Sequence, residues 1–232
     1  MKRMVAVGTL TLALFVSSPV LRCEAQTNEQ VPELTKPFNP PVKAMQAARE
    51  KLPIVSGMVS KENFKELGFQ SPEEAQQIQL GTPVPIFMVQ LDKLKSYEKG
   101  ADPVSLLTNT NRILYSLTVN GEPRSALVLH LVKGNWQMAS VGRPNFTKAL
   151  GSITREVVTR NKTKVESTFQ VEIPALNLNF VGQKDPSGLQ LTPLLDDPRF
   201  EFTAGRTLPA QEVFQRLAPY ARELKTGDRL VD

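Results

Sequence analysis

The chain has almost no cysteine or histidine, the residues that build disulfides and many metal centres. Its 232 residues include one cysteine and one histidine. A single cysteine excludes an intramolecular disulfide, and a single histidine excludes a multi-histidine zinc site. The sequence also lacks the nucleophile elbow G-x-S-x-G, the P-loop and the dinucleotide fingerprint G-x-G-x-x-G. We therefore expect neither a bound metal nor a cofactor.

The first 25 residues have the pattern of a secretory signal peptide. Lys2 and Arg3 form a short basic region, Met4–Val16 is an uncharged apolar stretch, and Ser17–Ala25 is a polar region. The apolar stretch is too short to cross a bilayer comfortably. This order predicts a signal peptide at residues 1–25 and export of the protein, which would be periplasmic or secreted.

Cleavage after Ala25 would leave Cys23 and Ala25 as the small residues at the two specificity positions. Lipidation of Cys23 is an alternative, but it requires a small residue where this chain has Arg22. An uncleaved N-terminal anchor is a further alternative. Cleavage would remove three basic residues and one acidic residue, and the formal charge would fall from +5 to +3. That charge is too small to indicate a nucleic-acid partner.

The mature chain begins with a proline-rich segment. Gln26–Pro41 contains four prolines and little apolar content, which predicts a disordered leader at residues 26–41. Residues 42–232 are then expected to form one α+β domain. Its two strand-then-helix stretches also allow a division into two lobes, at about 42–160 and 165–232.

Within this domain the pattern predicts mostly antiparallel strands with helices packed on them. A helix over 42–52 would end at Pro53, and the sequence from Ser71 to Gly81 has an N-cap, a capping box and a closing glycine. Apolar and alternating segments punctuated by turns predict the strands, and a helix follows them at 143–162. The alternation of apolar residues changes phase at Pro174, which predicts a bend between two strands. A final helix with a kink at Pro219 ends the chain.

The only histidine and the only tryptophan lie in one predicted hairpin, "SALVLHLVKGNWQMASVG". A two-residue turn at Gly134 and Asn135 places Trp136 on one apolar face and His130 on the other. A turn of either two or four residues at "NGEP" brings Tyr115 to the face that carries Val128 and His130. Both faces are largely apolar, so a helix, a ligand or a partner must cover the second one.

These observations predict a binding surface on that second face, formed by Tyr115, Val128 and His130. His130 itself reads most simply as a half-buried strand residue bonded to a neighbour, because no second ligand or nearby carboxylate accompanies it. Trp136 reads as a structural anchor with a partly covered ring.

A second candidate site is a group of basic residues at the end of the helix expected over 143–162. Arg155, Arg160, Lys162 and Lys164 complement the helix dipole, and they also allow weak contact with an anionic surface of the cell envelope.

The sequence therefore favours an exported, non-enzymatic protein that binds a protein partner or an apolar ligand through its sheet, with a chaperone-like or accessory role in the envelope. The alternative is an envelope hydrolase that uses carboxylates or a Ser–Lys pair. Ser96 and Lys99 match S-x-x-K, and K-T-G follows at 225–227, but the S-D-N element between them is missing.

Overall fold

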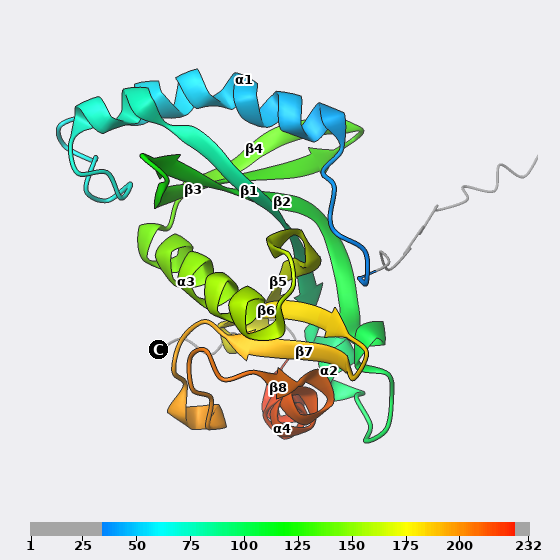
Figure 1. Ribbon diagram of the computed structural model, residues 1–232. Coiled ribbons are helices and arrows are strands. Elements are labelled where there is room, and N and C mark those ends of the chain that lie inside the picture. The colour runs from blue at the N-terminus through cyan, green and yellow to red at the C-terminus, as the bar shows by residue number, and fades with distance from the viewer. Residues whose placement is uncertain (1–33, 226–232) are drawn as a thin grey trace, which may run out of the picture.

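Residues 34–225 are described by a computed structural model (Figure 1). The signal peptide and cleavage site predicted at residues 1–25 lie outside the described residues. The helices are α1 (Val42–Met58), α2 (Leu91–Lys95), α3 (Pro144–Asn161) and α4 (Ala210–Glu223). The strands are β1 (Gln79–Val89), β2 (Leu107–Val119), β3 (Glu122–Val132), β4 (Asn135–Gly142), β5 (Thr168–Ile173), β6 (Leu178–Asp185), β7 (Gly188–Pro193) and β8 (Leu208–Pro209).

The described strands form one sheet in the order β4-β3-β2-β1-β5-β6-β7-β8. All neighbours are antiparallel except β1 and β5, which run parallel at the centre. The α+β fold with a mostly antiparallel sheet is thus confirmed. The parallel pair was not predicted, because three strands and α3 separate β1 from β5 and local patterns do not report such distant pairing.

The sheet bends around α3, so that the β1–β4 half and the β6–β7 half lie on opposite sides of this helix (Figure 1). Leu150, Ile153 and Val157 of α3 share one hydrophobic cluster with Val128 from the first half and Val181 from the second. The apolar face predicted for this helix is therefore buried between the two halves of the sheet, where it forms the inner layer of the molecule.

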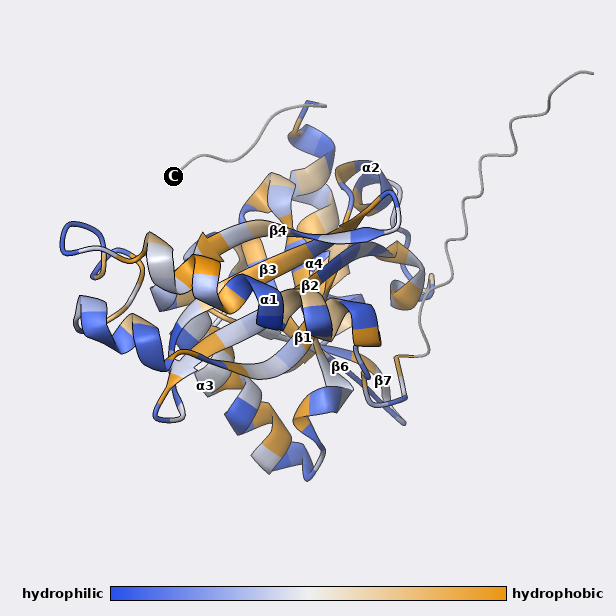
Figure 2. Ribbon diagram, turned by 90° about the horizontal axis from the view of Figure 1, so that it is seen from above, coloured by the Kyte–Doolittle hydropathy of each residue, from blue (hydrophilic) through white to orange (hydrophobic). Residues whose placement is uncertain are grey.

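The outer face of the sheet is covered by two other helices. Ala44, Ala48 and Val55 of α1 pack on the β2–β3 region, against residues that include Leu117 and Leu129. Figure 2 shows α1 lying across these hydrophobic strands, with hydrophilic residues along much of its exposed surface. The strands that are apolar on both faces are therefore covered by helices of the same chain, by α1 on the outer face and by α3 on the inner face.

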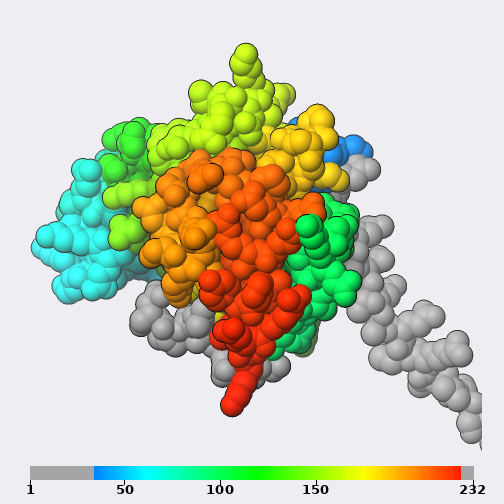
Figure 3. All heavy atoms as spheres, turned by 90° about the horizontal axis from the view of Figure 1, so that it is seen from below, coloured from blue at the N-terminus to red at the C-terminus, as the bar shows by residue number. Residues whose placement is uncertain are grey.

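Helix α4 closes the other half of the outer face. Val213, Phe214 and Leu217 are buried in the largest hydrophobic cluster. Figure 3 shows α4 beside the segment that contains α2. Arg222 ties the two together, since its guanidinium donates to the carbonyl oxygens of Lys95 and Tyr97, each at 3.0 Å. No helix among residues 34–225 is both long and apolar enough to span a bilayer.

Two helix predictions were wrong in extent. α1 does not end before Pro53 but continues to Met58. Pro53 lies on the exposed side of α1, where water can bond to the carbonyl that a proline leaves without a donor.

The segment from Ser71 to Gly81 forms only a short 3₁₀ helix, Pro72–Gln77, because the sheet takes the chain from Gln79 onward. The Glu74 carboxylate does not close a capping box. It accepts from the backbone N–H of Gln70 at 2.7 Å and from the Arg124 guanidinium at 3.1 Å.

Candidate functional site

A pocket of about 420 Å³ opens on the outer face of the sheet, beside the N-terminal end of α1. We call it the aromatic pocket. Its main apolar side chains are Leu34, Phe38, Phe87, Leu131, Trp136 and Phe169. They come from the leader, from β1 and β5 at the centre, and from the β3–β4 hairpin. Ligand sites in proteins commonly have volumes of about 300 to 1,000 Å³ and mostly apolar walls, so the aromatic pocket is large enough for a small ligand.

The floor of the aromatic pocket is well packed. Phe87 and Phe169 are 2% and 3% exposed, and their rings meet edge to face at 5.2 Å. Trp136 is only half-buried. Polar side chains from β2, Asn109 and Asn111, also line the pocket. A rigid aromatic floor with a few polar groups favours an apolar occupant that carries a hydrogen-bonding group.

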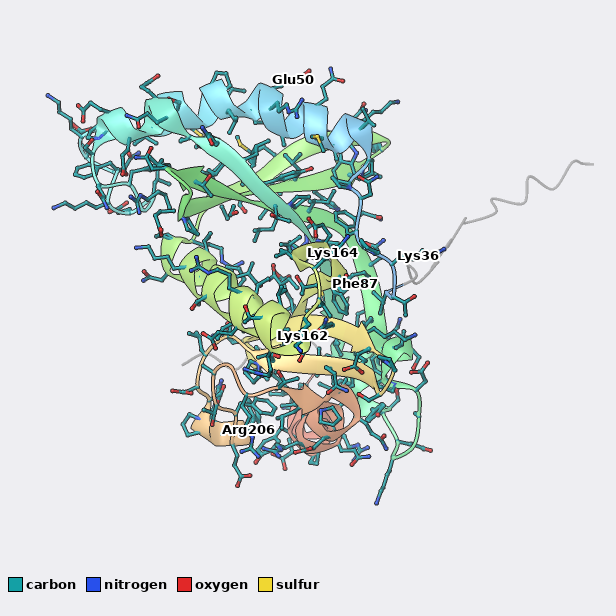
Figure 4. All side chains as sticks on the ribbon, viewed as in Figure 1. Lys36, Glu50, Phe87, Lys162, Lys164 and Arg206 are labelled. Atoms are coloured by element: carbon teal, nitrogen blue, oxygen red, sulfur yellow. The ribbon has the colours of Figure 1, made fainter. Side chains whose placement is uncertain are left out.

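Residues 34–41 form one wall of the aromatic pocket. Composition predicts disorder through Pro41, whereas the structure places Leu34–Pro41 beside the sheet (Figure 4, near Lys36 and Phe87). Leu34 is buried in the hydrophobic cluster of the second half, and the backbone N–H of Phe38 donates to the Glu166 carbonyl at 2.6 Å. Leu34 and Phe38 thus anchor this part of the leader through apolar packing, and Phe38 adds one backbone hydrogen bond.

The predicted surface of Tyr115, Val128 and His130 does not exist as one face. Tyr115 pairs with Leu127, whereas Val128 pairs with Leu114 and His130 with Arg112. Tyr115 therefore points outward beneath α1, and the other two point inward.

The cause of this error is a β-bulge. The turn at "NGEP" has two residues, as one of the two predicted alternatives required, but the register then shifts between Leu117 and Thr118. A single extra residue reverses the face of every residue beyond it.

The β3–β4 turn is also displaced by one residue. It is formed by Lys133 and Gly134, both with positive φ, so His130 pairs with Gln137. Trp136 and His130 still lie on opposite faces, because the pairing of Leu131 with Trp136 keeps the predicted parity. Trp136 packs against the cluster beneath α1, as expected of a partly covered anchor.

His130 lies at one end of a row of polar residues on the inner face. The guanidinium of Arg112, its cross-strand partner, forms a close ion pair with the Glu172 carboxylate of β5. Arg143, just before α3, approaches the other oxygen of Glu172 at 4.0 Å. With its carboxylate held between two guanidinium groups, Glu172 is arranged as a structural ion pair and not as a general base.

The basic residues at the end of α3 are all exposed, and two of them make different local contacts. Arg155 lines a cavity between α3 and the first two strands. The Arg160 guanidinium donates to Thr207 Oγ1 at 2.9 Å and to the Gly205 carbonyl at 3.1 Å. Lys162 and Lys164 follow the helix (Figure 4). Contact of this group with an anionic surface remains a proposal, and Arg160 already has a structural role.

Several side chains considered for the alternative chemistries make structural contacts in the described residues. Residues 34–225 contain no group of three or more metal-binding side chains. The Ser96 hydroxyl of the S-x-x-K pattern donates to the Lys93 carbonyl at 3.0 Å. The adjacent carboxylates of Asp196 and Asp197 accept bonds from Ala204 N–H and from Arg199, so they fix their own loop.

Comparison with known proteins gives no relative from which a function could be transferred, since no protein-family model, curated protein or solved structure matches the chain. Function can therefore be inferred only from the aromatic pocket and its surroundings.

Sequence reasoning missed the aromatic pocket. Phe87 and Phe169 read as ordinary strand residues, and only the unpredicted β1–β5 pairing brings their rings together. The usable signal was in the leader, where Leu34 and Phe38 stand four residues apart in a segment otherwise too polar and proline-rich to fold alone.

Proposed function

We propose that this chain is an exported, non-enzymatic binding protein that holds apolar groups of a polypeptide partner in the aromatic pocket. A chaperone-like or accessory role in the cell envelope follows from that activity and from the signal peptide predicted at residues 1–25. The observation that carries the proposal is the aromatic pocket itself, an apolar opening on the outer face of the sheet with Phe87 and Phe169 at its floor.

The leader supports a polypeptide as the main occupant. Leu34–Pro41 lies on this surface as an irregular, proline-rich segment that buries Leu34 and contributes Phe38 to the pocket wall. Proline-rich segments commonly dock in aromatic-lined grooves, because they have little conformational entropy to lose. A partner segment with spaced apolar side chains would use the same contacts. A small apolar molecule is the other occupant that fits the pocket.

Trp136 provides the experiment. It is the only tryptophan of the chain and it lines the aromatic pocket, so its fluorescence reports occupancy there. The purified chain should be titrated with an unfolded, tryptophan-free polypeptide and, separately, with a small apolar dye. We expect the polypeptide to change the Trp136 emission saturably and to remain soluble longer in the presence of the chain.

Phe38→Ala should weaken polypeptide binding about tenfold, since one apolar wall is removed. Phe64→Ala is the matched control, because Phe64 is also half-buried but lies outside the pocket. If the dye binds and the polypeptide does not, the occupant of the aromatic pocket is a small apolar ligand and not a protein partner. The absence of both, or equal effects of the two variants, would refute the proposal.

A further inference from the structure

A second cavity, of about 360 Å³, lies between α1 and the first two strands. We call it the Tyr115 pocket. Its lining includes Met45, Arg49, Leu52, Ile78, Leu80 and Tyr115. The pairing of β1 with β2 shifts between Leu80 and Pro83, and Pro83 is the partner of Tyr115. This bulge interrupts the ladder next to Tyr115, and bulges of this kind occur where a strand must make room or redirect a side chain.

The hydroxyl of Tyr115 is buried without a partner. Tyr115 is 1% exposed, and within residues 34–225 its hydroxyl oxygen makes no hydrogen bond. Such a group is costly in a folded protein and requires an explanation. Tyr97 shows the usual solution: it is 4% exposed, and its hydroxyl donates to the Ala101 carbonyl at 3.1 Å.

The missing partner must be a hydrogen-bond acceptor. Burial keeps the Tyr115 hydroxyl protonated, since it raises the pKa of this group to about 12. At physiological pH the hydroxyl therefore has a proton to donate, and no group within residues 34–225 receives it.

The rest of the lining defines the remainder of the ligand. Met45, Leu52 and Ile78 are apolar, and Arg49 is the one charged residue among the described residues that line the pocket. Arg49 is exposed on α1, so its guanidinium is available at the solvent side. Guanidinium groups bind carboxylates particularly well because they offer several N–H donors in a plane.

We propose that the Tyr115 pocket binds a straight-chain carboxylate such as a medium-chain fatty acid. The alkyl chain lies against the apolar side chains beneath α1, and the carboxylate accepts a hydrogen bond from Tyr115 and pairs with Arg49. This site is separate from the aromatic pocket, with which its lining shares no residue.

The test is calorimetric titration of the purified chain with sodium decanoate below its micelle concentration. Tyr115→Phe keeps the ring and removes only the hydroxyl. We expect it to weaken decanoate binding about ten- to a hundredfold, the usual value of a hydrogen bond to a charged group. Arg49→Gln should weaken binding of decanoate but leave binding of decanol unchanged, because decanol has no carboxylate.

Two variants serve as controls. Tyr97→Phe removes a buried hydroxyl elsewhere, and Phe38→Ala alters the aromatic pocket; both should bind decanoate as the wild type does. Circular dichroism should show that Tyr115→Phe is folded. The proposal is overturned if the wild type binds no decanoate, if Tyr115→Phe binds it normally, or if only Phe38→Ala loses it. The last result would place decanoate in the aromatic pocket.

Discussion

The two buried tyrosines should respond in opposite directions to the same substitution. Tyr97→Phe removes a hydroxyl that is bonded to Ala101, and the loss of one such bond costs about 1 kcal/mol of unfolding free energy. Tyr115→Phe removes a hydroxyl that has no partner, and with it a desolvation cost of about 1–3 kcal/mol. Part of that gain is lost to the small void that remains. We therefore expect Tyr115→Phe to be about 1 kcal/mol more stable than the wild type and Tyr97→Phe about 1 kcal/mol less stable.

Urea unfolding at pH 7, followed by circular dichroism without added ligand, measures both changes. In a parallel thermal unfolding experiment, each kcal/mol of unfolding free energy corresponds to a shift of about 2–4 °C in the melting temperature of a chain of this size. If Tyr115→Phe destabilises the protein as much as Tyr97→Phe does, the Tyr115 hydroxyl has a partner in solution. The case for a ligand acceptor in the Tyr115 pocket would then fail.

The burial of Tyr115 should also affect stability at alkaline pH. Burial raises the pKa of Tyr115 from 10.0 to about 12. The unfolded state therefore loses this proton first, so stability that is present below pH 10 is lost as the pH rises toward 12. Each unit of separation corresponds to about 1.4 kcal/mol. Tyr115→Phe should make stability less dependent on pH between 10 and 12, and an unchanged slope would contradict the burial of this hydroxyl.

Two further comparisons test the packing around the aromatic pocket and the hairpin. Gly182→Ala should lower the unfolding free energy by at least about 2 kcal/mol, because the new methyl group would overlap the ring of Phe169. Gly57→Ala in α1, where a methyl group meets no atom within 4 Å, should instead raise it by about 0.5–1 kcal/mol; similar effects of the two in urea unfolding would contradict the packing. Trp136→Ala should cost about 1–3 kcal/mol, since its ring is only half-buried. His130→Ala should leave polypeptide binding intact, and a folded His130→Ala protein that no longer binds would restore His130 as a site residue.

The fold could be predicted wherever a local pattern decides it. The strand pattern around the β2–β4 hairpins, the helix at Pro144–Asn161 and the bend at Pro174 each depend on a periodicity or a turn within a few residues. The helix expected at Ser71–Gly81 failed because Gln79 and the residues after it gain more from pairing with β2 than from a capping box. Tertiary pairing overrode local propensity there.

The site could not be predicted, for a different reason. Its geometry depends on register, and register depends on single extra residues. One bulge after Leu117 was enough to move Tyr115 from the face of His130 to the face beneath α1. Nothing in the alternation of apolar residues reveals such a bulge when both faces are apolar, because either register then buries a similar set of side chains.

Both pockets have a common physical origin in β1. Its pairing with β2 is irregular twice, once beside the Tyr115 pocket and once between Ile86 and Phe87, beside the aromatic pocket. At the second irregularity Asn111 adopts a positive φ and lines the aromatic pocket. Regular sheet would let a helix lie flat along its whole surface, whereas each bulge turns the strand and opens a gap that the covering helix does not fill. The sequence marks this strand with Pro83 and Pro85, which cannot donate to a ladder and are tolerated because β5 pairs with β1 only from Ile86 onward. Replacing either proline should therefore change the pairing of β1 and, with it, the shape of the neighbouring pocket. It would not remove any side chain that a ligand contacts in the two proposals.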